Sequence, residues 1–159
     1  MEIDLTDAVE SHADRMLLWQ RLLHPSAVAH FLGGEATDAR PLDSDNTGTA
    51  HGHTFRINGV GGGIFHARID RQAEHTTVAY VVWSEKMPES PILLTYTIDR
   101  SADRTLLRGV LAMDIPVEEV LASFGLLGLI MKPFAPELAR RFSARQLRKQ
   151  LITIATQTH

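Results

Sequence analysis

Turn motifs divide residues 35–116 into short segments, and this spacing constrains the fold more than any other feature of the chain. Apolar and polar residues alternate inside the segments, which is typical of half-buried strands. Connections this short join antiparallel neighbours, because parallel strands need a crossover of about a dozen residues. With a further strand near the N-terminus, the pattern predicts strands at 2–10, 36–43, 49–57, 63–71, 76–84, 92–99 and 104–114.

Two short helices are expected after the first strand. Ser11 is the predicted N-cap of a helix over about 12–23, and Asp14 completes an approximate capping box. Pro25 ends this helix, because the residue before a proline is pushed out of the helical region. A second short helix is predicted over 26–32.

The last part of the chain is predicted to be helical. Pro116 stands at a favoured first helical position. The apolar run 120–131 is too short to cross a bilayer, which takes about 20 residues, and it predicts a buried helix or a lid. A long helix follows over 136–156.

This long helix has an apolar set and a basic set of residues. The apolar set predicts an inward face made of Leu138, Phe142, Leu147, Leu151 and Ile154. Changing Leu138 or Phe142 to alanine is then expected to cost about 2–5 kcal/mol, as in other cores. The basic residues are interpreted as a solvated face: Arg140, Arg141, Arg145, Arg148 and Lys149.

Composition excludes several classes of function. The 159 residues favour one domain, 1–159, and a net charge of −3 gives no general attraction to nucleic acid. Without cysteine there is no disulfide, thiolate nucleophile or Cys-ligated zinc. The N-terminal sequence lacks a signal peptide and no segment is long enough to span a membrane, so a cytoplasmic protein without a nucleic-acid partner is expected.

The order of elements resembles the helix-grip fold of the START-like (SRPBCC) superfamily, which includes pollen-allergen-like proteins and polyketide cyclases. The segments LWQRLLHP at 18–25 and FLGG at 31–34 look like that superfamily's usual pattern, and so does Gly48 before a long strand. The resemblance implies an α+β fold in which a curved, seven-stranded antiparallel sheet wraps the C-terminal helix and encloses a cavity. Cavities with apolar walls bind hydrophobic small molecules.

Strand parity, combined with this resemblance, selects candidate ligand-binding residues. Residues two apart on a strand share a face of the sheet. The predicted wall consists of His51, His53, Phe55, Ile57, Phe65, Tyr80, Trp83, Tyr96, Leu111 and Met113, and the predicted lid or roof of Phe124, Leu127 and Phe134. Parity leaves the face of Trp83 undecided.

His51 and His53 carry the chemical alternatives. Two imidazoles on one face of a strand could share a metal ion, but a third ligand is lacking, so neither a metal nor a cofactor is expected. The pair could act as general acid or base near neutral pH, or form ordinary hydrogen bonds at the rim of the cavity.

Three functions remain open from the sequence. The leading hypothesis is a carrier or sensor for a hydrophobic molecule such as a lipid, an isoprenoid or a polyketide-like aromatic compound. The second is a cyclase or aromatase that folds its substrate in the same cavity, with the two histidines, Tyr80 and Tyr96 as polar groups. The third is an interaction protein that docks through 120–131, which would require this apolar segment to be exposed.

Overall fold

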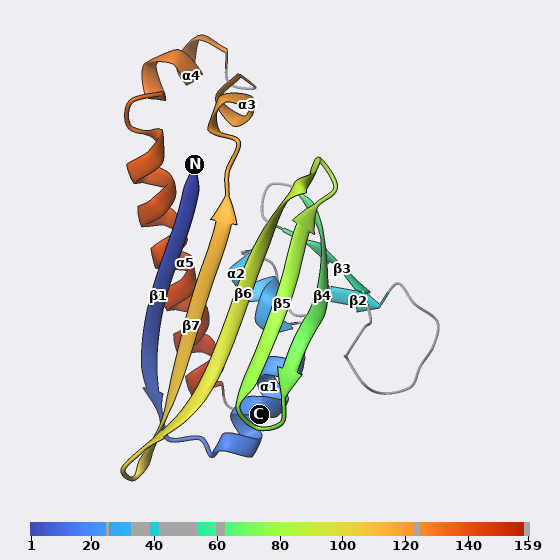
Figure 1. Ribbon diagram of the computed structural model, residues 1–159, viewed down its shortest axis with the longest axis vertical. Coiled ribbons are helices and arrows are strands. Elements are labelled where there is room, and N and C mark those ends of the chain that lie inside the picture. The colour runs from blue at the N-terminus through green and yellow to red at the C-terminus, as the bar shows by residue number, and fades with distance from the viewer. Residues whose placement is uncertain (25, 33–38, 42–53, 60–62, 123–124, 158–159) are drawn as a thin grey trace.

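An antiparallel sheet and a long C-terminal helix form the framework of the protein (Figure 1). The computed structural model describes residues 1–24, 26–32, 39–41, 54–59, 63–122 and 125–157. Within these ranges the strand order is β1-β7-β6-β5-β4-β3-β2. The strands are β1 (Glu2–Ser11), β2 (Ala39–Pro41), β3 (Thr54–Asn58), β4 (Ile64–Ala73), β5 (Thr77–Ser84), β6 (Met87–Ser101) and β7 (Arg104–Asp114). The predicted α+β class, with an antiparallel sheet and a C-terminal helix, is confirmed.

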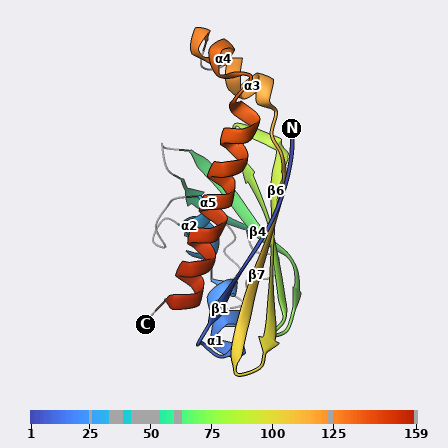
Figure 2. The same ribbon diagram turned by 90° about the vertical axis from the view of Figure 1, so that its left-hand side faces the viewer.

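The helices occupy two regions. α1 (Arg15–Leu23), α2 (Ser26–Phe31) and α5 (Ala135–Thr156) cover one face of the sheet. α3 (Val117–Ala122) and α4 (Leu126–Met131) project beyond the ends of the strands, at the top of Figure 2. The covered face is called the inner face below.

Alternate strand residues on the inner face form the core. They include Ile69, Val78, Tyr80, Leu94, Tyr96, Leu107 and Leu111, packed against Leu18, Leu22, Val28, Leu147, Leu151 and Ile154 of the helices. Gly109 of β7 lets α5 come close to the sheet. A Cβ atom at this position would lie 3.0 Å from the side chains of both Leu147 and Leu151.

The start of α1 differs from the prediction. Asp14, and not Ser11, caps the helix by accepting the backbone N–H of Leu17 at 2.7 Å, so α1 begins at Arg15. Ser11 lies too far upstream and instead donates its hydroxyl proton to the carbonyl of Ala155 at 2.8 Å.

Arg21 of α1 binds the same end of α5. Its guanidinium donates to the carbonyl of Ile154 at 2.8 Å and also to that of Gln157. The last carbonyls of a helix have no partner inside the helix. Ser11 and Arg21 therefore cap α5 from the other end of the chain.

β6 begins earlier than the predicted residue 92, although Pro88 and Pro91 favour a turn there. β6 pairs with β7 only from Ile92 onward, and its ladder with β5 passes from Ile92 to Met87 across an irregularity. Neither proline occupies a paired position in the described ladders, so the missing N–H groups break no ladder hydrogen bond.

The first half of α5 turns a different face to the sheet than predicted. Leu147, Leu151 and Ile154 are buried, but Leu138 is 49% exposed and Phe142 is 65% exposed. The prediction that these last two are core residues is wrong. The buried side of the helix continues instead through Ser143, four residues before Leu147.

α4 is not a buried helix, contrary to one of the two interpretations of 120–131. Gly128 is buried against α3, where a Cβ atom would lie 2.1 Å from the carbonyl oxygen of Leu121. The large apolar side chains on both sides of this glycine are exposed: Leu126, Leu127, Leu129, Ile130 and Met131.

Candidate functional site

The candidate site is the part of the inner face nearest to α3, where β6 begins and β7 ends. Met113 of β7 pairs with Ile92 of β6, and Ile92 pairs with Val82 of β5. Phe65, Ile92 and Met113 pack against the core but are only partly buried. The apolar inner face therefore extends beyond the part that the helices close off.

The structure brings seven of the predicted wall residues together on the inner face. Five of them are buried and two are partly buried: respectively Phe55, Ile57, Tyr80, Tyr96 and Leu111, and Phe65 and Met113. His51, His53 and Phe124 lie outside the described residues. Contact of any of these residues with a ligand stays a prediction.

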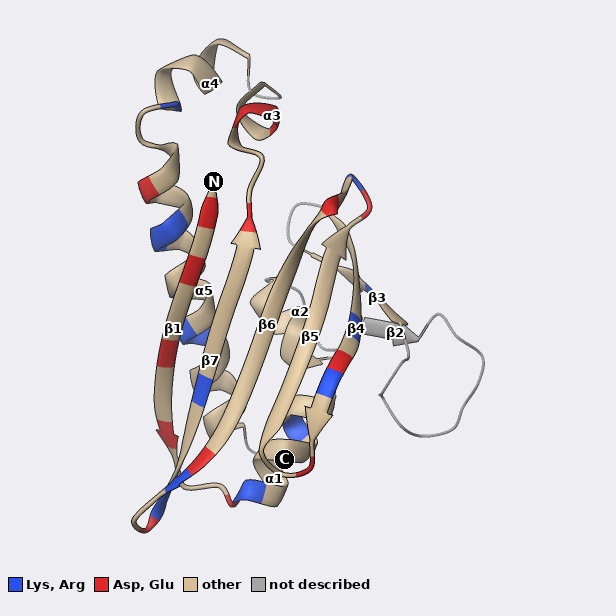
Figure 3. Cartoon of the chain, viewed as in Figure 1, with Lys and Arg blue, Asp and Glu red and all other residues tan. Residues whose placement is uncertain are grey.

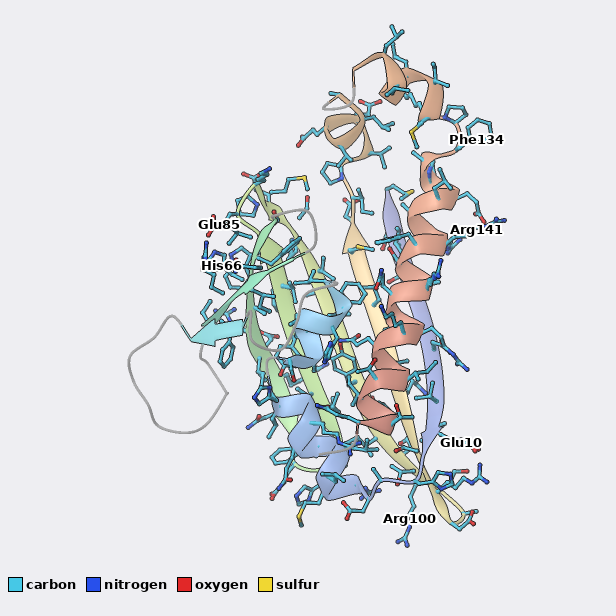
Figure 4. All side chains as sticks on the ribbon, turned by 180° about the vertical axis from the view of Figure 1, so that it is seen from behind. Glu10, His66, Glu85, Arg100, Phe134 and Arg141 are labelled. Atoms are coloured by element: carbon cyan, nitrogen blue, oxygen red, sulfur yellow. The ribbon has the colours of Figure 1, made fainter. Side chains whose placement is uncertain are left out.

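Trp83 lies on the outer face of the sheet. Its indole ring stacks on the imidazole of His66, with ring centres 5.7 Å apart. His66 Nε2 in turn lies 2.8 Å from Glu85 Oε1, and Figure 4 labels these two residues at the edge of the molecule. Trp83 thus faces away from the core residue Val82, its neighbour in the chain.

Leu127 and Phe134, two predicted roof residues, lie at the projecting end of the molecule. Leu127 of α4 is 65% exposed, and Phe134, which directly precedes α5, is 66% exposed. They belong to an exposed apolar surface formed by α4 and the start of α5.

Tyr80, Tyr96 and Gln150 place polar groups inside the core. Tyr80 donates its hydroxyl proton to the carbonyl of Leu22 at 2.6 Å. The amide nitrogen of Gln150 donates to the carbonyl of Ala27 and to the hydroxyl oxygen of Tyr96. The other amide atom, Gln150 Oε1, is buried and has no hydrogen-bond partner among the described residues. A buried unpaired acceptor costs about 1–3 kcal/mol, so this oxygen favours a donor that approaches it.

Gln150 was not predicted from the sequence, although its position in the helix indicates that it is buried. It lies three residues after Leu147 and four before Ile154, on the face of α5 that both residues turn to the sheet. A glutamine inside an apolar helix face is a candidate for a buried polar contact.

Burial determines the protonation of the two core tyrosines. Burial, followed by repulsion from Tyr96, raises the pKa of Tyr80 well above its ordinary value. Burial also raises the pKa of Tyr96, and the hydrogen bond from Gln150 opposes this shift only in part. Both phenols therefore stay protonated at neutral pH, where they can form hydrogen bonds but do not act as bases.

Two further properties bear on the predicted partners. Within the described ranges, no group of three or more His, Asp or Glu side chains is arranged to hold a metal ion. None of the described helices combines the length and hydropathy that a membrane crossing needs.

An open groove of about 580 Å³ lies at the end of the molecule opposite to α4. Its lining brings together the start of α1 and two turns of the sheet, and it includes His12, Arg15, His75, Arg100 and Asp103. Because cationic and anionic side chains are mixed there, the groove has no clear charge preference.

Comparison with known proteins finds similarity in structure alone. No protein-family model matches the chain, and no curated protein sequence matches it either. The crystal structure of protein CV1439 from Chromobacterium violaceum is similar, with a TM-score of 0.58, 16% identity, and coverage of 98% of this chain and 96% of that one.

Two further solved structures are similar over almost their whole length. The Aha1 dimer from Colwellia psychrerythraea has a TM-score of 0.56 and 11% identity, and the match covers 99% of each chain. Ara h 8.0201 has a TM-score of 0.52 and 10% identity, with 93% of this chain and 99% of that one covered. At these identities the likeness concerns the fold.

Proposed function

We propose that this chain, which has the helix-grip fold of START-like proteins, binds a hydrophobic small molecule on the inner face of its sheet. The observation that carries the proposal is the incomplete burial of Phe65, Ile92 and Met113, which continue the apolar core at this end of the sheet. Removing apolar surface from water stabilises a complex by about 25 cal/mol per Å². A ligand lying on these side chains gains affinity in this way.

The proposed site includes the predicted wall residues of the inner face, with His51 and His53 as groups that adjust ligand recognition. The ligand class is a lipid, an isoprenoid or a polyketide-like aromatic compound, and the role is that of a carrier or sensor. Gln150 Oε1 and Tyr96 Oη support a ligand that also has a hydroxyl group. A hydroxyl can donate to the unpaired amide oxygen and accept the proton of the phenol.

The first experiment is displacement of an environment-sensitive apolar dye by a panel of fatty acids, isoprenoid alcohols and aromatic polyketides. We expect saturable displacement at micromolar concentration. Ile92→Gln should weaken it at least tenfold, because Ile92 lies on the inner face. Leu93→Gln is the matched control: the adjacent side chain points to the outer face and is 45% exposed. Absence of saturable binding, or an equal effect of both substitutions, would contradict the proposal.

Two additions to this titration test the polar groups. A chelator should leave displacement unchanged, while the His51→Ala/His53→Ala variant should alter it. Displacement abolished by chelator would instead indicate a metal site at the two histidines. An isoprenoid alcohol should bind about tenfold more tightly than the corresponding hydrocarbon, which equals one hydrogen bond of about 1.4 kcal/mol. Gln150→Leu should remove this preference, and a preference that persists would exclude Gln150 as the contact.

A further inference from the structure

We propose that α4 and the first half of α5 form a surface that binds to an anionic lipid bilayer. This inference goes beyond the ligand site, because the residues concerned lie at the projecting end of the molecule. Four side chains of α4, those of Leu126, Leu127, Leu129 and Ile130, are 65–78% exposed, and Met131 is 43% exposed. All large side chains of this helix are apolar.

The large side chains of α4 form a broad apolar face on the side away from α3. Successive residues of a helix are turned by about 100°, so residues 126, 127, 129 and 130 lie within an arc of about 160°, on the side opposite to Gly128. Only Gly128 is buried. The apolar face of such a helix can be buried at the boundary between the headgroups and the acyl chains of a bilayer.

α5 continues the surface with two parallel stripes. Phe134, Leu138 and Phe142 are spaced four residues apart, so they share one side of the helix, and they are 49–66% exposed. The basic residues Arg141, Arg145 and Lys149 follow the same spacing next to them. In Figure 4 the side chains of Phe134 and Arg141 both project outward from the upper part of α5. An apolar stripe beside a basic stripe is typical of helices that lie in the lipid interface.

The charges of this region favour anionic lipid. Between residues 132 and 149 there are six cationic side chains and one acidic side chain, Glu137. Glu137 pairs with Arg141 at 2.7 Å, whereas Arg145 and Lys149 have no ion pair among the described residues. Lys and Arg side chains near an anionic membrane are attracted to its surface. The attraction to anionic lipid is limited to this region, because the whole chain has a net charge of −3. Figure 3 shows acidic residues spaced along β1.

Charged residues next to α4 limit how deeply this helix can enter the bilayer. Glu118 and Glu119 lie in the first turn of α3, and Lys132 follows α4 and pairs with Glu118 at 3.3 Å. Charged groups remain in the headgroup region, because burying them in hydrocarbon is unfavourable. The proposed arrangement therefore immerses α4 and leaves the sheet outside the bilayer.

The test is co-sedimentation of the full chain with phosphatidylcholine vesicles that contain or lack phosphatidylserine. We expect binding to the anionic vesicles, at least tenfold weaker binding to the neutral ones, and loss of binding as salt increases. Leu127→Ser/Ile130→Ser should reduce binding at least tenfold. Met16→Ser/Leu93→Ser is the matched control, because both side chains are exposed and lie away from α4.

A third variant separates charge from apolar contact. Arg145→Gln/Lys149→Gln should remove the preference for phosphatidylserine and leave the weak binding to neutral vesicles unchanged. All substituted side chains are exposed, so thermal melts should match the parent within a few degrees. No vesicle binding, or binding that the α4 substitutions do not change, would overturn the proposal. Self-association lost in the α4 variant would overturn it too, in favour of contact between copies.

Discussion

The inward face of α5 can be tested by comparing Leu151→Ala with Leu138→Ala. Both residues are leucines of the same helix, but Leu151 is 0% exposed and Leu138 is 49% exposed. The substitution removes about three carbon groups, each worth about 0.8 kcal/mol when fully buried. The two positions should therefore respond very differently.

For Leu151 the transfer contribution is about 2.4 kcal/mol, and a cavity adds to it. The cavity is hard to refill, because the residue opposite is Gly109, which has no side chain. We expect a total loss of about 3–5 kcal/mol. For Leu138 about half of the transfer contribution is at stake and no cavity forms, so the loss should be about 1 kcal/mol or less.

Urea denaturation followed by far-ultraviolet circular dichroism measures both losses, provided that the slope of the transition is unchanged. In thermal melts each 1 kcal/mol corresponds to about 2–4 °C for a chain of this size. Equal losses of stability in the two variants would refute the assigned face of α5. Large losses in both variants would favour the face predicted from the sequence, which contains both residues.

Three further predictions concern polar groups that are buried or partly buried. Arg21→Met should lower the free energy of unfolding by about 1.5–3 kcal/mol, because charged hydrogen bonds to the end of α5 are lost. Urea denaturation measures this loss. An unchanged midpoint of the urea transition would contradict the role of Arg21 as a cap. Tyr80 and Tyr96 are the two tyrosines of the chain, and burial raises both pKa values. Phenolate absorbance should therefore appear only as alkali unfolds the protein. A phenolate signal near pH 10 from the folded state would refute this prediction. Burial, then the charge of Lys149, lowers the pKa of His30 from 6.5. The folded state thus binds this proton less readily than the unfolded state, so the free energy of unfolding should fall as pH drops below about 6.5. The fall should be smaller in His30→Asn. Identical plots of stability against pH for the parent and the variant would exclude His30 as the source of the fall.

Strands bounded by strong turn motifs could be predicted from the sequence. The predicted strand 104–114 has the observed limits of β7, and the predicted 76–84 differs from β5 by one residue. Here turn chemistry and alternation are local properties that agree with each other. The start of β6 was harder to predict. A strand can contain its two prolines only where their positions are not paired with a neighbouring strand, and this pairing is not a local property.

The face of α5 could not be chosen from the helix alone. Phe142 and Leu147 are five residues apart, which rotates them by about 140°, so one side of a helix cannot bury both. The sequence therefore contains two apolar stripes. Close approach at Gly109 decides that Leu147 and Leu151 face the sheet and leaves Leu138 and Phe142 exposed.

The candidate site was predictable where it depends on strand parity and unpredictable where it depends on contacts between distant segments. Parity correctly grouped Phe65, Tyr80, Tyr96 and Met113 on one face. The contacts of Gln150 with Ala27 and Tyr96 bring together three separate parts of the chain. No local pattern specifies such a meeting.

The pairing of β1 with β7 has a consequence for folding during synthesis. Glu2 pairs with Asp114 and Ser11 with Thr105, so β1 must wait for about a hundred residues before its partner leaves the ribosome. The hairpins from β4 to β7 close between neighbours in sequence, whereas this ladder closes a long loop and is expected to form late. During the wait β1 is a free strand that could pair with other chains. The acidic side chains of Glu2, Asp4 and Glu10, exposed along it, oppose such pairing through mutual repulsion.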